Sequence, residues 1–286
     1  MMKEQQLGPH HLDTAETLNN LAVLSFHQGW YSESESLYRR ALTIKEQQLG
    51  MEHSKTADTL NNLAVLYRNQ GRYSEAEPLY LRTLTIWEQQ LGPQHPDTVF
   101  ALGNLGRLYC LQARYEKAEP YLQQALLLSE VHFGPEHPYT AQSLSNLARL
   151  CVDQRRYEQA ESLFQRALII REQHLGKRHP YTALTLNSLA MLSSAQGKDI
   201  EAIVFFERAL AIQEKQLGPE HPDVANSLND LAGVYMKQAS YEQAEPLFQR
   251  ALAIREHKLG TEHPDTIITR ENYANLLRKM KWEEEC

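Results

Sequence analysis

The sequence lacks the features of several common classes of protein. Basic residues are not in excess, because 29 Lys and Arg stand against 36 Asp and Glu, a formal net charge of −7, whereas a general nucleic-acid binder is normally basic. No apolar run approaches the roughly 18 residues that would span a bilayer, and Met1–Gln6 has no apolar segment like that of a secretory signal. We therefore expect a cytoplasmic, soluble protein that binds neither nucleic acid nor membrane.

Cysteine is scarce and catalytic motifs are missing. Cys110, Cys151 and Cys286 have neither disulfide nor metal spacing, which fits a reducing compartment. The sequence has no glycine-rich phosphate loop, no His-Glu-x-x-His and no Gly-x-Ser-x-Gly. Its glutamates recur at first-turn positions of expected helices, where they suit the helix dipole rather than acid/base catalysis: Glu75, Glu77, Glu116, Glu119, Glu242 and Glu245. We expect no enzyme, no cofactor and no metal site.

What the sequence does contain is a repeat of 42 residues. A Leu-Gly or Phe-Gly pair marks it, with 42 positions from Leu7 to Leu49 and again from Leu49 to Leu91. The pairs begin at Leu7, Leu49, Leu91, Phe133, Leu175, Leu217 and Leu259. A fixed period in this range is the signature of a solenoid.

Each repeat is expected to form two amphipathic helices, A and B, because its apolar and small residues are spaced by three and four. In one repeat they are Ala57, Leu60, Leu63, Ala64 and Tyr67 for helix A, then Ala76, Leu79, Tyr80, Leu84 and Ile86 for helix B. Helix A should open at a Pro-Asp-Thr stretch, capped by Asp or Thr, and end near Gln70-Gly71. Helix B should open with a capping box at residues 74–77 and close at Gly92.

The repeat predicts one array over residues 1–286, with six full repeats and a seventh helix A at residues 265–280. After it, residues 282–286 look like the start of a further helix B, which would leave Leu276, Leu277 and Trp282 uncovered. Residues 3–8 match residues 45–50, so the chain is expected to begin inside the last turn of a helix. We therefore expect an array truncated at both ends, with open edges.

These residues resemble a known family. Leu60, Leu63-Ala64, Tyr67, Gly71, Tyr73, Ala76, Tyr80, Leu84 and Ile86 follow the tetratricopeptide pattern, and the long period with its Leu-Gly-Pro-x-His-Pro-Asp linker is similar to the kinesin light chain type. The resemblance implies an all-α, right-handed α-solenoid of antiparallel helix pairs with 42-residue repeats. It also implies that helices A line a concave wall and that the protein is a non-catalytic scaffold for protein partners. Small residues at Ala64, Ala76, Ala148 and Ala160 would let helices approach closely, and Tyr67, Tyr80 and Phe164 would fill the gaps.

Residues that recur in every repeat are interpreted as structural. One histidine per linker is too far from the next to share a metal ion, so we expect a linker role such as helix capping for His53, His95, His137, His179, His221 and His263. A second set is expected to satisfy backbone groups with a buried amide, ligand contact being the alternative: Asn20, Asn62, Asn104, Asn146 and Asn272, with Ser188 and Asp230 as replacements. Glutamines at the end of helix A, Gln70 among them, are also expected to be structural.

Positions that vary between repeats are the candidates for ligand binding. Three columns on one side of helix A vary in this way, one through Asn61, one through Arg107 and one through Arg68. With two residues beside the columns, Asn69 and Phe100, the candidate residues are Asn61, Arg68, Asn69, Phe100, Arg107, Ser145, Arg149, Asn187, Met191 and Asn229. The arginines could hold carboxylates in a bidentate fork, the asparagines could bond an extended peptide backbone, and the apolar residues could take an aromatic anchor. The resemblance implies such a groove in kinesin light chains, with Asn61, Asn187 and Asn229 matching its asparagines.

We expect a scaffold that binds an extended acidic peptide with an aromatic anchor. Arginines merely solvated on an open face are the alternative at the level of the site. At the level of function, the alternatives are a structural spacer that self-associates through open ends and a sensor or autoinhibitory arm of a larger signalling protein.

Overall fold

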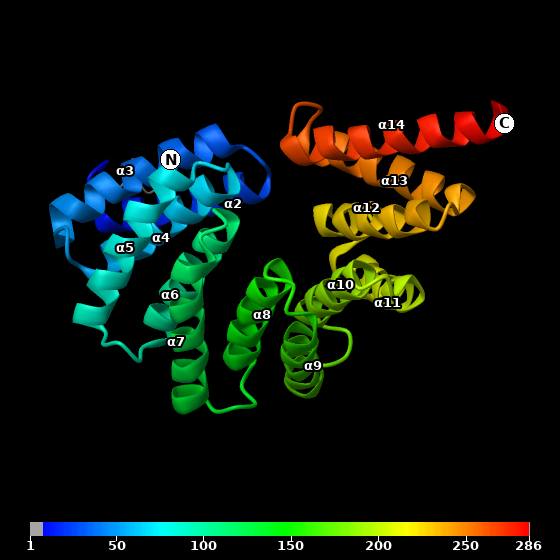
Figure 1. Ribbon diagram of the computed structural model, residues 1–286. Helices are drawn as coiled ribbons and strands as arrows, with labels where there is room; N and C mark the ends of the chain where they lie inside the picture. Colours follow the sequence, from blue (N-terminus) through cyan, green and yellow to red (C-terminus); the bar gives the residue numbers. More distant parts are fainter. Residues whose placement is uncertain (1–7, 286) are drawn as a thin grey trace. The chain divides into compact units, whose positions relative to one another are not determined.

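The computed structural model describes residues 8–285, so the helix turn expected at residues 3–7 lies outside them. Every regular element in this range is an α-helix (Figure 1). The helices are α2 Leu12–His27, α3 Tyr31–Leu49, α4 Ser54–Asn69, α5 Tyr73–Gln90, α6 Pro96–Leu111, α7 Tyr115–Phe133, α8 Pro138–Asp153, α9 Tyr157–His174, α10 Pro180–Ala195, α11 Asp199–Leu217, α12 Pro222–Lys237, α13 Tyr241–Leu259 and α14 Pro264–Glu285.

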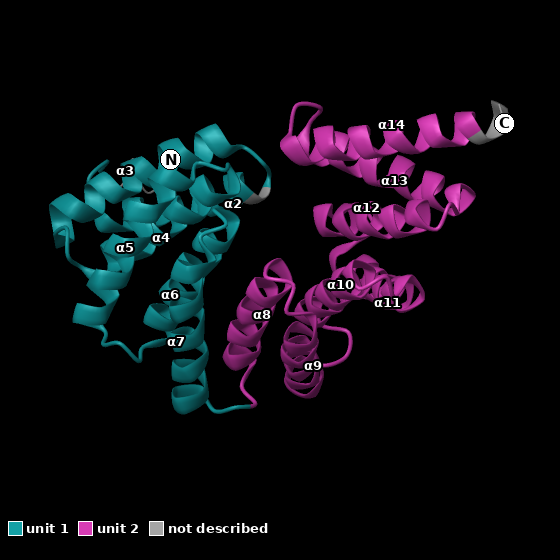
Figure 2. Cartoon of the chain, in the orientation of Figure 1, with its two compact units in different colours: residues 1–135 teal, residues 136–286 magenta. Residues whose placement is uncertain are grey.

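The even-numbered helices are the A helices and the odd-numbered ones the B helices. Each A helix packs against the B helix that follows it, and within each unit each B helix packs against the next A helix. This arrangement confirms the predicted all-α solenoid of antiparallel helix pairs. The chain divides into two compact units (Figure 2), Met1–Pro135 with α2 to α7 and Glu136–Cys286 with α8 to α14. Each unit is described by itself, and the single array remains a prediction.

Histidine, rather than the expected Asp or Thr, caps the A helices. In each linker the histidine Nδ1 accepts a hydrogen bond from the backbone N–H two residues later, at 3.1 to 3.3 Å. The threonine does something else, since Thr98 donates its hydroxyl to the carbonyl of Gly92 at 2.8 Å. It thereby fastens the start of α6 to the chain leaving α5. The predicted structural role of the linker histidines is confirmed.

The A helices end in a left-handed turn, as predicted. Gly71 has a φ of +73°, which glycine adopts without a steric penalty. Ala113 and Arg155 replace that glycine in their repeats and keep a positive φ of 55° and 60°. The turn is therefore imposed by the packing of the helix pair and does not depend on glycine.

The predicted capping box at residues 74–77 is wrong. α5 begins at Tyr73, and its N-cap is Arg72, whose side chain makes no capping hydrogen bond among the described residues. The Arg72 N–H instead bonds the carbonyl of Tyr67 at 2.9 Å, which closes the end of α4. Glu75, inside the predicted box, pairs with the Arg72 guanidinium at 2.7 Å.

The last helix also differs from the expectation. α14 runs unbroken from Pro264 to Glu285, so Trp282 continues it and does not start a B helix. Leu276 was expected to be uncovered, but it is fully buried against Ala232, Ala244 and Phe248. Leu277 and Trp282 are 42% and 73% exposed.

Small and large apolar residues alternate in the core as predicted. Ala64, Ala76, Ala148 and Ala160 are fully buried, and Tyr67, Tyr80 and Phe164 are at most 3% exposed. In the second unit Phe164 packs with Ala148 and Ala160, and Phe206 packs with Ala190 in the next repeat. Each aromatic ring of helix B thus lies against an alanine of its own helix A.

Candidate functional site

The candidate residues lie on the A helices, which contact one another in sequence within each unit. α4 touches α2 and α6 in the first unit, and α10 touches α8 and α12 in the second. We call the side of the A helices that carries the three variable columns the A-helix face.

A ladder of asparagine side chains joins neighbouring A helices. The Asn62 amide donates to Asn19 Oδ1 at 3.4 Å and the Asn104 amide to Asn61 Oδ1 at 3.1 Å. In the second unit the Asn272 amide donates to Asn229 Oδ1 at 3.1 Å. These amides therefore bond other side chains and not the backbone groups that the sequence suggested. Asn61 and Asn229 are both partners in this ladder.

In the first unit, Asn104 brings two candidate residues together. Its amide donates to Asn61, and its Oδ1 accepts a hydrogen bond from Arg68 at 3.4 Å. Arg68 is only 8% exposed, so it is not the solvated arginine of the alternative interpretation.

A second arginine shares an electrostatic environment with Arg68. Burial raises the pKa of the Tyr80 phenol, and the charges of Arg68 and Arg107 act in the opposite direction. Both guanidinium groups therefore lie close enough to influence the same buried hydroxyl, one from α4 and the other from α6. The first unit places two cations on neighbouring A helices, with the partly exposed Arg107 nearer to solvent.

The other two candidates of the first unit are Phe100 and Asn69, on α6 and α4. Phe100 is 39% exposed and lies two helical turns before Arg107 on α6. The exposed Asn69 turns its amide back to the carbonyl of Val65 at 3.0 Å.

The second unit carries the remaining candidates. Ser145 is 4% exposed and donates to the carbonyl of Ala141 at 2.8 Å. Arg149 is partly exposed and acts electrostatically on Asp153, whose pKa is raised by burial and lowered in part by this arginine. Asn187 donates to Ser227 Oγ at 2.7 Å, and Met191, one turn further along α10, is 57% exposed.

Sequence reasoning missed a column of buried polar groups on the B helices. Arg171, 4% exposed, donates to Thr185 Oγ1 at 2.5 Å, to the carbonyl of Tyr181 at 3.2 Å and to Gln142 Oε1 at 3.0 Å. It thus joins α9 to α8 and α10. The column comprises Lys45, Ser129, Arg171, Gln213 and Arg255, and at its remaining position Trp87 donates its indole N–H to the carbonyl of Ser54 at 3.3 Å. The sequence did indicate this column, because Arg171 lies seven residues after the core residue Phe164 and hence on the buried side of α9.

At least one of the glutamates that were assigned to the helix dipole also bonds the next repeat. Glu77 in α5 accepts hydrogen bonds from the Tyr109 hydroxyl at 3.0 Å and from Arg114 at 2.6 Å. Both donors belong to the next repeat, so the carboxylate fastens one helix pair to the next. Arg114 also lies over the Tyr109 ring, 4.7 Å from its centroid. This glutamate is a structural contact between repeats.

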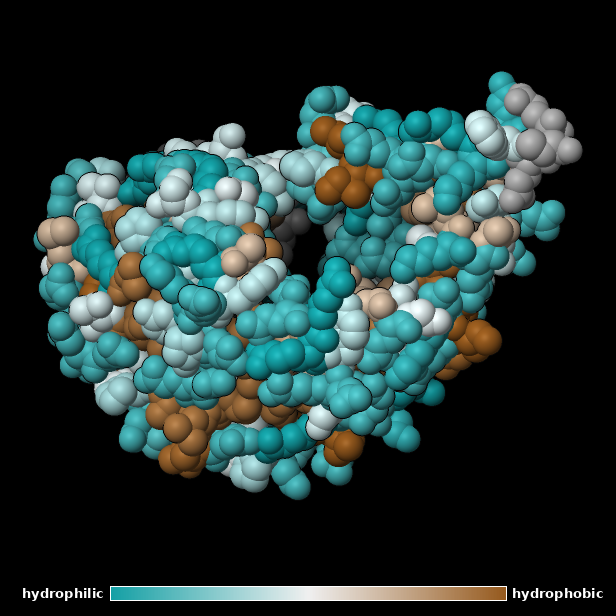
Figure 3. Space-filling model, in the orientation of Figure 1, coloured by the Kyte–Doolittle hydropathy of each residue, from teal (hydrophilic) through white to brown (hydrophobic). Residues whose placement is uncertain are grey.

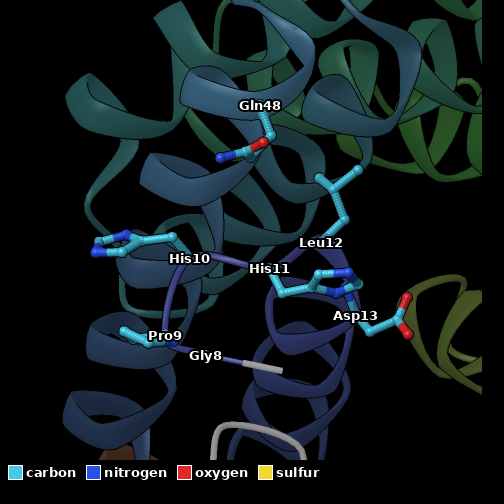
Figure 4. Close-up of a pocket in the computed structure, with 7 residues that line it drawn as sticks. All are labelled: Gly8, Pro9, His10, His11, Leu12, Asp13 and Gln48. Carbon is cyan, nitrogen blue, oxygen red and sulfur yellow. The ribbon is translucent and has the colours of Figure 1, made fainter. Parts of the chain in front are cut away.

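The first linker lines a pocket, but its two histidines do not converge there. Figure 4 shows that His10 points away from His11, whose ring lies beside Asp13. His11 is already committed to capping α2. Across residues 8–285, no three His, Cys, Asp or Glu side chains come together in a way that could hold a metal ion.

The face shown in Figure 3 is largely hydrophilic with scattered apolar patches. Within the described residues, no helix combines the length and apolar character that a membrane crossing requires.

Comparison with known proteins identifies the family. Tetratricopeptide repeat models match residues 14–54 and, in overlapping stretches, residues 55–130, 109–173, 151–215, 181–256 and 223–284. The chain therefore belongs to the tetratricopeptide repeat family, and these matches indicate no enzyme family. A search of the curated proteins found no match.

Solved structures place the repeats with the kinesin light chain type. BtubC (BKLC) from P. vanneervenii is 27% identical, with a TM-score of 0.59, over 84% of this chain and 94% of its own. A putative kinesin light chain from Podosopora anserina, with nearly identical repeats, is 27% identical, with a TM-score of 0.55, over 72% of this chain and 98% of its own. A Rap protein complexed with Competence and Sporulation Factor shares the fold at 16% identity, with a TM-score of 0.64, over 92% of this chain and 75% of its own.

Proposed function

We propose that this protein is a scaffold whose A-helix face binds an extended, acidic peptide segment of a partner protein, with an aromatic side chain as anchor. Tetratricopeptide solenoids generally mediate protein–protein interaction. A Rap protein of the same fold was solved in complex with Competence and Sporulation Factor, so this architecture can hold a partner.

The pair of arginines in the first unit is the observation that supports an acidic ligand. Arg68 and Arg107 come from adjacent A helices and act on the same buried phenol. Neighbouring cations attract carboxylates, and a guanidinium can hold one with two parallel hydrogen bonds. Arg68 is held by Asn104, which fixes its position. Arg107 is the more accessible of the two, so we assign it the first contact with the peptide.

Exposed apolar residues on the same face support an aromatic anchor. Phe100 precedes Arg107 by two turns in the first unit, and Met191 is 57% exposed in the second. A buried aromatic side chain commonly supplies much of the binding energy at an interface.

The test is a titration of acidic peptides with and without a tryptophan, followed by fluorescence anisotropy. We expect wild-type affinity of about micromolar Kd, weaker binding at higher salt, and a loss of about tenfold for Arg107→Ala, since a charge-assisted hydrogen bond contributes about 1.5 kcal/mol or more. Arg149→Ala, made separately, tests whether the arginine of the second unit also contributes to peptide affinity.

A matched control removes the same charge elsewhere. Arg178 is exposed in the linker between α9 and α10, so Arg178→Ala should leave the affinity nearly unchanged. If Arg107→Ala and Arg149→Ala both bind the peptides as tightly as the wild type, the assignment of the A-helix face is wrong.

A structural spacer that self-associates is the second candidate. Its support is the exposure of Leu277 and Trp282 on α14, since exposed apolar side chains on one element can form an interaction surface. Light scattering over a concentration series tests it: association that Trp282→Lys abolishes would support the spacer, whereas a strict monomer at high concentration would exclude it.

A further inference from the structure

The asparagine ladder of the second unit is interrupted between α10 and α12. In three other rungs an amide donates to the asparagine 43 positions earlier: Asn62 to Asn19, Asn104 to Asn61 and Asn272 to Asn229. The residue 43 positions after Asn187 is Asp230, whose carboxylate has no hydrogen to donate. The register of the repeat thus places two acceptors at the positions where the three asparagine rungs have a donor and an acceptor.

The structure shows the consequence at Asn187. Its Oδ1 is a buried atom without a hydrogen-bond partner among the described residues. Its amide is satisfied, because it donates to Ser227 Oγ at 2.7 Å, and Ser227 in turn donates to Gln213 Oε1 at 2.6 Å. An unsatisfied buried carbonyl oxygen costs about 1 to 3 kcal/mol, so a hydrogen-bond donor to this oxygen would stabilise the fold.

Asp230 is joined to the rest of the ladder on its other side. Its Oδ1 accepts a hydrogen bond from the Asn229 amide at 3.1 Å, and Asn229 Oδ1 accepts from Asn272. A hydrogen on the second carboxyl oxygen of Asp230 would therefore connect two existing chains of hydrogen bonds into one, from Asn272 to Gln213.

Four helices pack against α12, and three of them carry charged residues. α10 has no acidic or basic residue, α13 contributes Arg255, and α14 contributes Arg270 and Glu271, both exposed. α11 contributes Glu207, which bonds Tyr235. Burial raises the pKa of Asp230, and the Asn229 hydrogen bond and the Arg255 charge lower it in part, with a net rise.

We propose that Asp230 is a protonation switch: in its neutral form it donates its O–H to Asn187 Oδ1 and completes the ladder between α10 and α12, and in its ionised form it breaks the ladder at this point. A proton on Asp230 satisfies Asn187 Oδ1 better than a ligand would, because this oxygen is buried between the helices. This role is independent of any peptide on the A-helix face.

The direction of the pH effect follows from the sign of the shift. A carboxyl whose pKa is raised on folding holds more protons in the folded state than in the unfolded one. Its contribution to stability is complete below the ordinary value of 3.8 and is lost as the pH rises through the folded-state pKa. The contact between α10 and α12 should thus be firmest in acid.

NMR of the aspartate carboxyl carbons in the full chain measures the switch directly. We expect the Asp230 resonance to titrate above the usual aspartate range, and Asn187→Ala to lower its midpoint, because the acceptor that favours the neutral form is gone. Titration of Asp230 at or below the usual range, or a midpoint that Asn187→Ala leaves unchanged, would overturn the proposal. Circular dichroism verifies that the variant is folded.

A second variant, Asp230→Asn, provides a hydrogen-bond donor at this position at every pH. Asp230→Asn restores the amide of the other rungs, and we expect it to raise the thermal midpoint of the second unit by about 2 to 4 °C at pH 7.5, with a smaller difference in acid. Glu271→Gln removes an exposed carboxylate on α14 and should leave the midpoint unchanged. A midpoint for Asp230→Asn at or below that of the wild type at pH 7.5 would contradict the switch.

Discussion

The hydroxyl of Tyr67 in α4 donates a hydrogen bond to the carboxylate of Glu35 in α3 at 2.9 Å. Arg72, at the start of α5, donates to the same carboxylate at 2.6 Å and lies over the Tyr67 ring, 4.0 Å from its centroid. One carboxylate of a B helix thus holds both helices of the next repeat. The same arrangement recurs one repeat later at Glu77.

Glu35 should therefore make the first unit sensitive to acid. Burial raises the pKa of Glu35, but hydrogen bonds from Arg72, Tyr67 and Arg39 prevail and lower it from 4.5 to about 2. A lowered carboxyl pKa gives stability that is present above pH 4.5 and is lost as the pH falls through about 2. We expect Glu35→Gln to cost about 1 to 2 kcal/mol at pH 7 and much less near pH 2, as measured by urea unfolding at both pH values.

Glu88 is the matched control for Glu35. It is an exposed glutamate of α5, and in the following repeat Gln124 stands where other B helices carry a pairing arginine such as Arg82. Glu88→Gln should change the stability by no more than about 0.5 kcal/mol. Equal losses for the two variants at pH 7 would rule out a special role for the Glu35 contact.

Arg171 should contribute through its hydrogen bonds rather than its charge. Burial lowers its pKa to about 10, and its guanidinium satisfies acceptors on α8 and α10. Arg171→Ala should cost about 2 to 4 kcal/mol, because three buried or partly buried acceptors lose their donor.

Two variants at position 171 separate hydrogen bonding from charge. Arg171→Gln keeps part of the hydrogen bonding and matches Gln213, which fills the same position two helices later. It should therefore be clearly milder than Arg171→Ala in chemical denaturation. An Arg171→Gln variant as unstable as Arg171→Ala would show that the charge is what matters.

Gly106 and Leu122 should behave as a coupled pair. A Cβ at Gly106 would lie 2.5 Å from Leu122 Cδ2, so Gly106→Ala should destabilise the first unit by about 1 to 3 kcal/mol. Other repeats combine alanine with an aromatic ring here, as in Ala64 with Tyr80. Adding Leu122→Phe should restore much of the loss, since a ring at this position accommodates an alanine. A double-mutant cycle from unfolding curves measures the coupling, and strictly additive effects would disprove it.

The helix pairs could be predicted from the sequence because their causes are local. Proline, glycine and the spacing of apolar residues set where each helix lies, and the structure confirms the repeat throughout residues 8–285. The helix starts were less predictable. Ser74 and Glu77 had the right spacing for a capping box, but the tight turn after α4 makes Arg72 the N-cap.

The candidate site was only partly readable from the sequence. The columns on the A helices follow from helical geometry, so Arg107, Phe100 and Met191 were correctly expected to show partial or full exposure. Helical geometry does not reveal which polar side chains bond a neighbouring repeat. Arg68 and Asn61 are therefore partners of Asn104 as well as candidates for ligand contact. Their roles in binding remain a prediction.

The sequence by itself determined the repeat, its two helices and the linker between them, since each depends on residues a few positions apart. Tertiary structure alone decided which side chains meet across repeats, because residues such as Asn61 and Asn104 lie 43 positions apart and bond each other only when the helices stack. The same stacking decides whether a polar side chain lies in water or inside an interface. That difference changes the energy of an unpaired oxygen from negligible to about 1 to 3 kcal/mol.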